Sequence, residues 1–419
     1  MIKPLAPTDL LNVTLRWADN DIQTVGRLGY VNRVAHFEYA DDIRSSNIEI
    51  SPVRHRFSVG SATIRPFDVA LFEGLHGVFH DSLPDSWGRL LTDRRARELG
   101  IEPATLTPLD RLAWVGDRGI GALCYEPGVN VWNEKQSALD LDLLASDARN
   151  VLEGNVSDVV AELGHLGGSP GGARPKAMVA IDADDGAIYG SAEFDPKYQH
   201  CLVKFRGTDD PTDAANIEKA YANMAEAAGV RVPVTRLIAD YKGNQYFVSQ
   251  RFDRVGKKRL HAHSASGLLY ADFRLPSLDY RDLITLTRAI THDRREVSAM
   301  FALAVFNVLA HNRDDHARQF TFLMTRNGQW QLAPAYDLTF SPGPGGEHST
   351  SVLGRGKQIT NSHLMALGKS ADLDDTESKR IIERTAAAVA DWERFARNCD
   401  VGRASRSRIG SALASSQKI

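Results

Sequence analysis

Two polar motifs, separated by a short hairpin-like stretch, constrain this chain more than any other feature of its sequence. An apolar helical run ends in HNRDDH (His311–His316), and two strand-like segments follow at Phe320–Thr325 and Gln331–Ala333, on either side of an Asn-Gly turn. The second segment leads into APAYDL, which carries Asp337. The chain therefore places acidic motifs at both ends of one predicted hairpin.

The order of helix, aspartate loop, hairpin and second aspartate is the order in which protein kinases build their phosphotransfer centre. In that centre the first aspartate accepts the proton of the substrate hydroxyl, and a polar residue five positions later binds metal. The second aspartate holds Mg²⁺ against the phosphates. The corresponding residues here are Asp314, Gln319 and Asp337. An acidic loop after a helix is also a common solvated turn, so this interpretation depends on the rest of the chain.

Length and composition set the broad class. The 419 residues suggest two to three domains, and the 43% hydrophobic and 25% charged content is that of an ordinary soluble globular protein. A formal net charge of −3 gives no electrostatic reason to expect nucleic acid or membrane as the main partner. The three cysteines form no CxxC or Cys/His cluster, and the sequence has neither a signal peptide pattern nor a membrane-length apolar run. We therefore expect a soluble, cytoplasmic protein.

The first 135 residues are predicted to form a small α+β domain. Short alternating segments separated by Asp, Asn and Gly turns predict strands, and two longer apolar patterns predict helices. The strands are expected at Leu11–Trp17, Gln23–Tyr30 and Val34–Tyr39, and the helices at Phe67–Leu75 and Trp87–Leu99. Between the helices, HDSLPDSWGR (His80–Arg89) fits a structural loop that ends in a helix N-cap. Pro127–Asn133 is the predicted boundary.

A glycine-rich run, LGGSPGGARPK (Leu166–Lys176), lies in the second predicted domain, residues 150–253. Glycine occupies four of the six positions from Gly167 to Gly172, so the backbone can approach an anion closely and form a nest of N–H groups for phosphate. Arg174 and Lys176 add positive charge. A flexible surface loop has the same composition, but the segments that follow favour phosphate binding.

Lys204 lies on an otherwise apolar predicted strand, Gln199–Phe205. An unpaired ammonium group is costly to bury, so this lysine requires a partner. Glu218, near the start of the predicted helix Asn216–Gly229, offers one. A strand lysine paired with a helix glutamate is the arrangement found in kinases.

The next predicted strand, Gln245–Gln250, leads into Arg251–Arg254 (RFDR), which we interpret as the hinge between two lobes. The backbone of a kinase hinge meets the adenine ring, so Gln250 and Phe252 are candidate nucleotide contacts.

Residues 254–419 are predicted to be mainly helical around the two aspartates. Apolar stripes at helical spacing place helices at Asp282–Thr287, Glu296–Ala310 and Thr376–Phe395. Thr339–Thr360 is rich in Gly, Pro and Ser and has the composition of a mobile activation segment. Ser405–Ile419 is expected to be a frayed tail.

The kinase features occur in kinase order from Gly167 to Asp337, and together they are far more specific than any one alone. Most of the chain resembles the HipA toxin kinases of bacterial toxin–antitoxin pairs. The motifs that carry the resemblance are HDSLPDSWGR, SPGGARPK, HNRDDHARQFTFL and APAYDL. The resemblance implies that Ser169 is autophosphorylated, and that this modification expels the nucleotide loop and silences the kinase. It also implies that Lys176, at the loop, and Lys204, on the strand, correspond to the lysines of the family.

The candidate site combines the residue patterns with this resemblance. The expected catalytic residues are Asp314 and His316, the metal ligands Gln319 and Asp337, and the modified residue Ser169. The expected nucleotide contacts are Gly171, Gly172, Ala173, Arg174, Lys176, Lys204, Glu218, Gln250 and Phe252. The expected cofactors are ATP and Mg²⁺.

One position departs from the family pattern, which has Asn where this chain has Gln319. A Gln carbonyl can still ligate a hard cation, but the extra methylene moves the oxygen by about one bond, and Mg²⁺ tolerates little geometric error. The departure bears on the second metal and on the catalytic rate rather than on the fold.

The expected fold class is α+β: a two-lobed protein-kinase-like fold with an extra N-terminal α+β subdomain (1–135), an N-lobe with the Gly-rich loop (150–253) and a mainly helical C-terminal lobe (254–419). The expected activity is that of an ATP- and Mg²⁺-dependent serine/threonine protein kinase. The resemblance implies a HipB-like helix-turn-helix antitoxin as partner, operator DNA reached indirectly through it, and a translation-related protein substrate such as an aminoacyl-tRNA synthetase. No membrane partner is expected.

Two alternatives stay open. One is a weakly active pseudokinase that acts as a co-repressor with a DNA-binding antitoxin, which Gln319 favours. The other is a small-molecule kinase of related fold, because the same spacing of Asp, Asn or Gln, hairpin and second Asp occurs there too.

Overall fold

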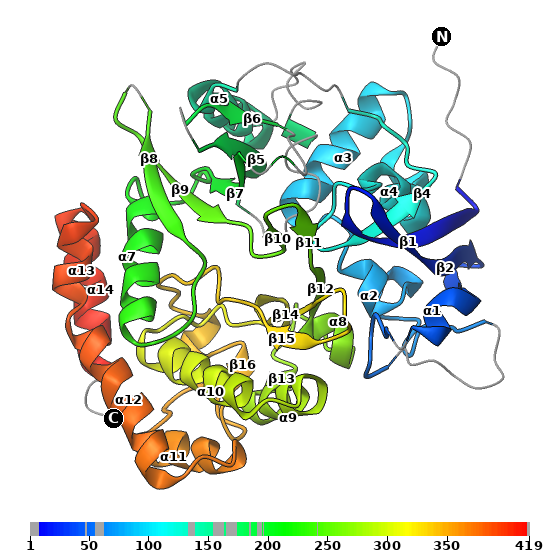
Figure 1. Ribbon diagram of the computed structural model, residues 1–419. Coiled ribbons are helices and arrows are strands. Elements are labelled where there is room, and N and C mark those ends of the chain that lie inside the picture. The colour runs from blue at the N-terminus through cyan, green and yellow to red at the C-terminus, as the bar shows by residue number, and fades with distance from the viewer. Residues whose placement is uncertain are drawn as a thin grey trace.

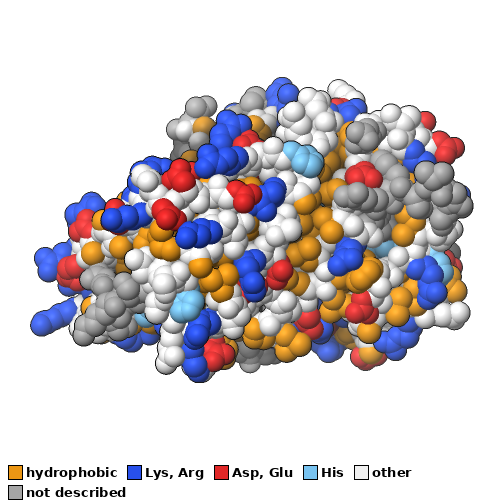
Figure 2. Space-filling view, turned by 90° about the horizontal axis from the view of Figure 1, so that it is seen from below, with side chains coloured by type: hydrophobic (Ala, Val, Ile, Leu, Met, Phe, Trp, Pro, Cys, Tyr) orange, Lys and Arg blue, Asp and Glu red, His pale blue; other side chains and the backbone are white. Residues whose placement is uncertain are grey.

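The computed structural model describes residues 8–46, 48–54, 63–132, 139–153, 163–164, 174–183, 186–190, 195, 197–240 and 242–416. Figure 1 shows the N-terminal sheet and its helices on the right and the second sheet with helix α7 to their left. Of the C-terminal helices, α9 to α12 lie below, and α13 and α14 lie at the left beside α7. On the face seen from below, basic and acidic side chains are interspersed (Figure 2). Within the described residues, no helix combines the length and the apolar run needed to cross a bilayer.

The N-terminal part is built on a four-stranded antiparallel sheet in the order β3-β2-β1-β4. Alternation along β1 buries Leu11, Val13, Leu15 and Trp17 on one face, as the sequence pattern predicts. The strands are β1 (Leu10–Ala18), β2 (Asp21–Val31), β3 (Val34–Tyr39) and β4 (Leu123–Glu126). The helical elements are α1 (Asp41–Ser45), η1 (Phe72–Gly74), α2 (Gly77–His80), α3 (Ser86–Glu98), η2 (Pro103–Thr105) and α4 (Pro108–Val115).

The central part is a five-stranded antiparallel sheet in the order β6-β5-β7-β9-β8. Its members are α5 (Leu141–Leu152), β5 (Lys176–Asp182), β6 (Ile188–Tyr189), β7 (Tyr198–Lys204), α7 (Ala214–Ala227), β8 (Thr235–Ala239) and β9 (Gln245–Gln250). Trp87 and Leu91 of α3 pack into the same apolar core as α5 and this sheet. The N-terminal part is thereby fastened to the central sheet.

The C-terminal part is mainly helical and contains a three-stranded sheet in the order β12-β14-β15. Its strands are β10 (Arg254–Val255), β11 (Lys258–Arg259), β12 (His261–Ser264), β13 (Leu278–Asp279), β14 (Thr321–Met324), β15 (Trp330–Leu332) and β16 (Thr350–Ser351). Its helices are α8 (Ala265–Leu269), α9 (Tyr280–Thr291), α10 (Arg294–Leu309), η3 (Ala317–Gln319), η4 (Pro344–Gly346), α11 (Asn361–Ser370), α12 (Asp375–Ala390), α13 (Trp392–Asn398) and α14 (Arg403–Ser416). Helix α10 is apolar on nearly all sides because it lies at the centre of the largest core.

Most predicted elements are confirmed, and three differ. The stretch Phe67–Leu75 contains only the short η1, with Phe72 and Glu73 in left-handed backbone. The predicted helix Thr376–Phe395 is two helices that meet at Asp391. The expected frayed tail from Ser405 instead forms most of α14, which buries Ile409 and Leu413.

Candidate active site

A cavity of about 1,420 Å³, which includes space open to solvent, lies where the three parts of the chain meet. Its lining contains eight of the predicted site residues: Lys176, Lys204, Glu218, Gln250, Phe252, His316, Gln319 and Asp337. The N-terminal part contributes Asp81, Ser82, Leu83, Asp85 and Ile120 to the same lining. None of the predicted site residues lies in that part, so the sequence did not reveal this wall of the site.

Lys204 is the central cation of this cavity. Its Nζ donates to Glu218 Oε2 at 2.6 Å and also to Asp337 Oδ1. Burial would lower the pKa of Lys204, but the two carboxylates outweigh it and raise the pKa above its usual value. The predicted ion pair of Lys204 and Glu218 is therefore present, and the same ammonium group reaches the predicted metal ligand.

Lys176 on β5 lies directly opposite Lys204 on β7 in the register of the two strands. The two ammonium-bearing side chains thus share one face of the sheet, on the cavity side. Burial lowers the pKa of Lys176, and attraction to Asp337 offsets part of that effect. Lys176 and Lys204 thus bring two buried cations to this end of the cavity, with the carboxylates of Glu218 and Asp337 beside them.

Arg174 does not line the cavity, although it was predicted to contact the nucleotide. Its Nη1 donates to Glu218 Oε1 at 2.8 Å, and its Nη2 lies 2.9 Å from Asp210 Oδ1. Glu218 is therefore held by cations on both oxygens, Arg174 on one and Lys204 on the other. Ser169, Gly171, Gly172 and Ala173 lie outside the described residues.

Asp337 lies after the hairpin β14–β15 in left-handed backbone, with φ of 55°. Burial would raise its pKa, but Lys204 and Lys176 hold the pKa well below its usual range. Gln319 Nε2 donates to Asp337 Oδ2 at 3.3 Å and lies 3.4 Å from His316 Nε2. The predicted pair of metal ligands is therefore in direct contact, but through the amide nitrogen of Gln319, so the amide would have to turn its oxygen toward Asp337 to share an ion with it.

The donor set fits Mg²⁺ better than a transition metal. A carboxylate and a carboxamide oxygen are hard ligands, and protein Mg²⁺ sites commonly use one or two carboxylates together with substrate phosphates. Among the described residues, no group of three or more His, Cys, Asp or Glu side chains could hold a metal ion unaided. Gln319 and Asp337 would therefore hold the ion jointly with a phosphate-bearing ligand.

Asp314 lies on the loop after α10 and is exposed, in contrast to its neighbour Asp315, which is fully buried. Within the described part of the chain, its carboxylate makes no hydrogen bond. Partial loss of hydration raises the pKa of Asp314, and repulsion from Asp337 and Asp315 adds to the effect, while His316 opposes it. Asp314 does not line the cavity, but a carboxylate that no described residue binds by a hydrogen bond, and whose pKa is raised, is suited to accept a proton from a ligand.

Asp253, a residue of the hinge, connects the hinge to the N-terminal part, and the sequence pattern assigned its carboxylate no separate role. Asp253 is buried and accepts hydrogen bonds from Arg251 and Arg254, and from the backbone N of Gly121 at 2.7 Å. Both arginines also donate to Gly119 O. The loop around Ile120 is thereby fixed beside the predicted adenine contacts.

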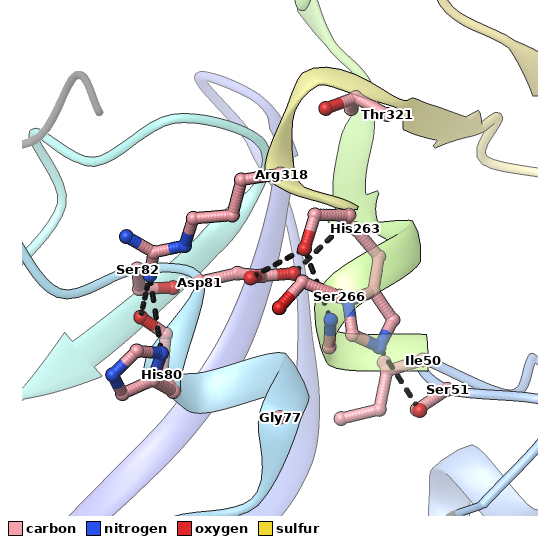
Figure 3. Close-up of polar contacts among 12 residues, drawn as sticks. Ile50, Ser51, Gly77, His80, Asp81, Ser82, His263, Ser266, Arg318 and Thr321 are labelled. Atoms are coloured by element: carbon pink, nitrogen blue, oxygen red, sulfur yellow. Dashed lines mark hydrogen bonds and ion pairs between the residues drawn. The ribbon is translucent and has the colours of Figure 1, made fainter. Parts of the chain in front are cut away.

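The wall formed by the loop after α2 is held by Asp81 (Figure 3). Asp81 Oδ2 accepts from His263 Nδ1 at 2.6 Å and from Ser264 N at 2.7 Å, and Oδ1 accepts from Ser264 Oγ at 2.7 Å. Burial opposes the charge of Asp81, but the hydrogen bond and charge of His263 outweigh it and lower the pKa to about 2. His263 Nε2 lies 3.0 Å from Ser51 Oγ. This chain of Ser, His and Asp is structural, because Ser51 is 1% exposed and does not line the cavity.

Arg318 connects the turn η3 to the same wall (Figure 3). Its Nη1 donates to Asp85 Oδ2 at 3.2 Å, and its Nη2 donates to His80 Nδ1 at 3.1 Å. Burial lowers the pKa of His80 to about 3, so the ring is neutral at pH 7 and can accept from the guanidinium. The HDSLPDSWGR loop therefore has the structural role expected of it, and it also lines the cavity.

Family models and solved structures place these observations among known proteins. Residues 17–126 match the HipA N-terminal domain, and residues 168–392 match the HipA-like C-terminal domain. A search of curated proteins finds no significant match. The HipA, HipB and operator DNA complex of Shewanella oneidensis MR-1 is similar in fold over 97% of this chain and 95% of that chain, with 14% identity and a TM-score of 0.68.

The Helicobacter pylori proinflammatory kinase CtkA is also similar, at 13% identity over 59% of this chain and 89% of that chain. The TM-score of this match is 0.41. The HipA-like C-terminal domain alone spans more than half of the chain and follows the HipA N-terminal domain, with the cavity between them. The chain belongs to the HipA family.

Proposed function

We propose that this protein is an ATP- and Mg²⁺-dependent serine/threonine protein kinase and a HipA-like toxin. The observation that carries the proposal is Lys204, whose ammonium group contacts Glu218 on α7 and Asp337 after the hairpin at one end of the cavity. This is the lysine, glutamate and metal aspartate arrangement that positions nucleotide phosphates in kinases.

The reaction would depend on positioning and charge rather than on covalent chemistry. Lys204 and Lys176 bind phosphate oxygens, and Glu218 fixes the direction of Lys204. Asp337 and Gln319 would hold Mg²⁺, which would supply positive charge to neutralise the phosphates. Asp314 orients the substrate hydroxyl and accepts its proton, for which its raised pKa makes it a better base. His316, in contact with Gln319, keeps that side chain turned toward Asp337.

The partners are proposed from the family. The solved Shewanella structure contains HipB and operator DNA beside HipA. We expect a HipB-like helix-turn-helix antitoxin here, with operator DNA reached mainly through that partner, because a net charge of −3 gives this chain little attraction for phosphates. The proposed substrate is a translation-related protein of the cytoplasm, such as an aminoacyl-tRNA synthetase.

Silencing by autophosphorylation at Ser169 is part of the proposal. Phosphate adds about 1.5 to 2 negative charges beside the phosphates that the Gly-rich loop covers, and so lowers the affinity for ATP. The modification requires the loop to swing out, so we expect it to be slow and intermolecular. Mass spectrometry after incubation with Mg-ATP, with ATP binding measured on both forms, tests this. Phosphate found only elsewhere, or unchanged ATP binding by the phosphorylated form, would contradict it.

Incubation with γ-labelled ATP and Mg²⁺, followed by phosphosite mapping, tests the function itself. Transfer of label to serine or threonine of a protein supports the kinase, with Asp337→Asn as the inactive control. Turnover without labelled protein indicates a small-molecule kinase. The contact of the Gln319 amide with Asp337 favours a second candidate, a weakly active pseudokinase co-repressor, for which no label is transferred while operator binding with the antitoxin is retained.

A further inference from the structure

The segment after Asp337 packs against the loop that carries Asp314, although its composition predicts a mobile activation segment. His348, Thr350 and Val352 are buried. The segment begins with a parallel bridge between Asn312 and Ser341. It continues with the parallel pairing of β16 with β13, Thr350 opposite Leu278 and Ser351 opposite Asp279. Residues 341–354, here called the clamped segment, thus have a defined place beside the catalytic loop.

Asp315 is the centre of this packing. Its carboxylate is fully buried and has four donors within the described chain. Oδ2 accepts from Tyr280 Oη at 2.7 Å and from His348 Nδ1 at 2.9 Å. Oδ1 accepts from the backbone N of Ser349 at 2.8 Å and of Thr350 at 3.2 Å. Three of the four donors belong to the clamped segment.

The backbone on both sides of Asp314 is held by the same segment. Ser349 N donates to Arg313 O in the residue before Asp314, at 3.2 Å. Thr350 Oγ1 donates to the carbonyl of Asp315, the residue after it. The exposed carboxylate of Asp314 is therefore mounted on a backbone that the clamped segment fixes at both neighbours.

The fourth donor connects Asp315 to the helical core. Tyr280 begins α9 and is fully buried, and its Oη also accepts from Asn307 Nδ2 at 2.9 Å. Asn307 Oδ1 in turn accepts from Asn312 Nδ2 at 2.9 Å. These contacts join α10 through Tyr280 to Asp315, so the carboxylate is fixed from the core side. If the clamped segment moved away from the loop, this buried carboxylate would lose three of its four donors, which costs free energy.

We propose that Asp315 is a positioning residue whose carboxylate holds the clamped segment against the catalytic loop and thereby fixes Asp314 without phosphorylation of that segment. The proposal rests on the proposed kinase function. In kinases that need it, activation-segment phosphorylation orders the segment through charge-assisted hydrogen bonds between phosphate and arginine. Asp315 places an anion at the equivalent junction in the unmodified chain, and its donors are two backbone N–H groups, a phenol and an imidazole.

The experiment compares Asp315→Ala and Asp315→Asn with wild type and with Asp110→Asn. Asp110 is a matched control because it is also buried and accepts from Thr8 and Thr107, but it lies in the N-terminal part away from the cavity lining. Two quantities are measured in the full chain: trypsin cleavage after the exposed Arg355 and Lys357, and the kinetics of phosphate transfer.

For Asp315→Ala we expect cleavage at these two sites to be about tenfold faster, because the segment opens more often. We also expect kcat to fall about 100-fold while KM for ATP changes less than about twofold, since the lost positioning concerns Asp314 and not the lysines. Asp315→Asn retains the shape and one acceptor and should be intermediate. The control should match wild type in cleavage, kcat and KM.

Tyr280→Phe removes one donor and keeps the ring, and it serves as the second variant if Asp315→Ala does not fold; a smaller change in the same two quantities is expected. Unchanged cleavage in both variants overturns the proposal, whatever the kinase activity. Loss of wild-type activity on phosphatase treatment, with a phosphosite found in residues 341–354, also overturns it. A wild type without any phosphate transfer overturns the proposed function and the positioning role, while the cleavage rates alone still decide whether Asp315 holds the segment.

Discussion

At the scale of single residues, Asp337 combines an uncommon backbone conformation with a strongly stabilised charge. Its φ of 55° is one that Asn and Asp tolerate better than most other non-glycine residues. Its carboxylate faces Lys204 Nζ on one oxygen and Gln319 Nε2 on the other. The backbone conformation directs the carboxylate into the cavity. A substitution that keeps the side-chain shape but removes its charge separates the effect of the conformation from that of the charge.

Asp337→Asn should therefore lose activity without losing the fold. The amide accepts the left-handed backbone but removes the charge that Mg²⁺ and Lys204 require, and we expect kcat to fall at least about 100-fold. Phosphate transfer from labelled ATP measures the loss, and the far-UV circular dichroism spectrum shows whether the fold is retained. Asp19→Asn, at an exposed ion pair with Arg16, is the control. Unchanged turnover in Asp337→Asn would remove Asp337 from the site.

Substitutions at Gln319 test whether this side chain, which is longer than the Asn of the family pattern, binds the metal ion. Gln319→Ala should lower activity by about tenfold or more, because it removes an oxygen ligand, whereas Gln319→Asn should retain or raise it. The measurement is the Mg²⁺ dependence of phosphate transfer for the three forms. An inactive wild type with an active Gln319→Asn variant would favour the pseudokinase, and equal activity in all three would mean that position 319 does not ligate.

Sequence reasoning found those site residues whose signal is local. Lys204 is recognisable because an ammonium group on an apolar strand needs a partner, and Glu218 is only 14 positions away. Asp81 and Asp253 give no such signal, since their partners lie 182 and 132 residues away, at His263 and Gly121. Asp315 was visible only as a second acid beside Asp314, and its burial could not be read from the pattern.

At the scale of elements, strands and amphipathic helices were predictable where one face is buried by a regular pattern. The expected helix at Phe67–Leu75 failed because Phe72, Glu73 and Gly74 all have positive φ. A Cβ at Gly74 would lie 2.1 Å from Arg33 O, so a contact across the fold sets this backbone and not local propensity. Conversely, Ile409 and Leu413 have the spacing of one helix face, which could have predicted α14.

The segment after Asp337 is ordered, although its composition predicts a mobile segment. Gly, Pro and Ser in Thr339–Thr360 do predict the absence of long regular elements, since only η4 and the two-residue β16 occur there. They do not predict mobility, because order comes from hydrogen bonds to Asp315 and to Asp279, which accepts from Ser351 Oγ and Gly354 N. Composition indicates how freely a segment can move by itself, but it does not indicate which distant residues will form hydrogen bonds with its backbone.

The contact between the loop after α2 and strand β12 is predicted to be sensitive to acid. The pKa of Asp81 is lowered to about 2, below its value of about 3.9 in an unfolded chain, so its ionisation stabilises the fold fully above about pH 4. That contribution is lost as the pH falls toward 2. We expect Asp81→Asn to lower the free energy of unfolding by about 2 kcal/mol at pH 7.

Urea unfolding of wild type and Asp81→Asn at pH 7, 4 and 3 measures this effect. The difference between the two proteins should be largest at pH 7 and smaller at pH 3, because protonated Asp81 resembles the amide. Asp19→Asn, which alters only an exposed ion pair, should change stability by less than about 0.5 kcal/mol. A difference that is constant with pH would show that the charge of Asp81 does not hold this contact.

At the scale of the whole molecule, the cavity is made by three stretches that are far apart in sequence. The central sheet supplies the lysines, the hairpin region supplies Asp337, and the N-terminal part supplies Leu83 and Ile120. Each stretch could be assigned to its own part of the fold from the sequence. Their meeting could not, because it depends on buried contacts such as those of Trp87 with the central sheet and Asp253 with Gly121.

Ile120, in the N-terminal wall of the cavity, is expected to contribute to nucleotide affinity. Ile120 lines the cavity and lies between Gly119 and Gly121, which the hinge residues Arg251, Asp253 and Arg254 hold in place. An apolar side chain beside the hinge would cover one face of an adenine ring. Ile120→Ala removes part of that surface, at about 1 kcal/mol, so the Kd for ATP should rise about fivefold. The phosphate-binding residues are untouched, so kcat at saturating ATP should change less than about twofold.

Isothermal titration with ATP and Mg²⁺ measures the affinity, and Ile101→Ala serves as the control. Ile101 is a partly buried residue of the same N-terminal part that packs near Trp114 and Trp132, away from the cavity lining. Inorganic triphosphate, which lacks the base, should bind wild type and Ile120→Ala equally, since it would contact only Lys176, Lys204 and the predicted metal ligands, which line the cavity. Weaker triphosphate binding in Ile120→Ala would mean that the substitution disturbs the whole cavity. An unchanged Kd for ATP would mean that the base binds elsewhere, and that the N-terminal part encloses the site without contacting the nucleotide.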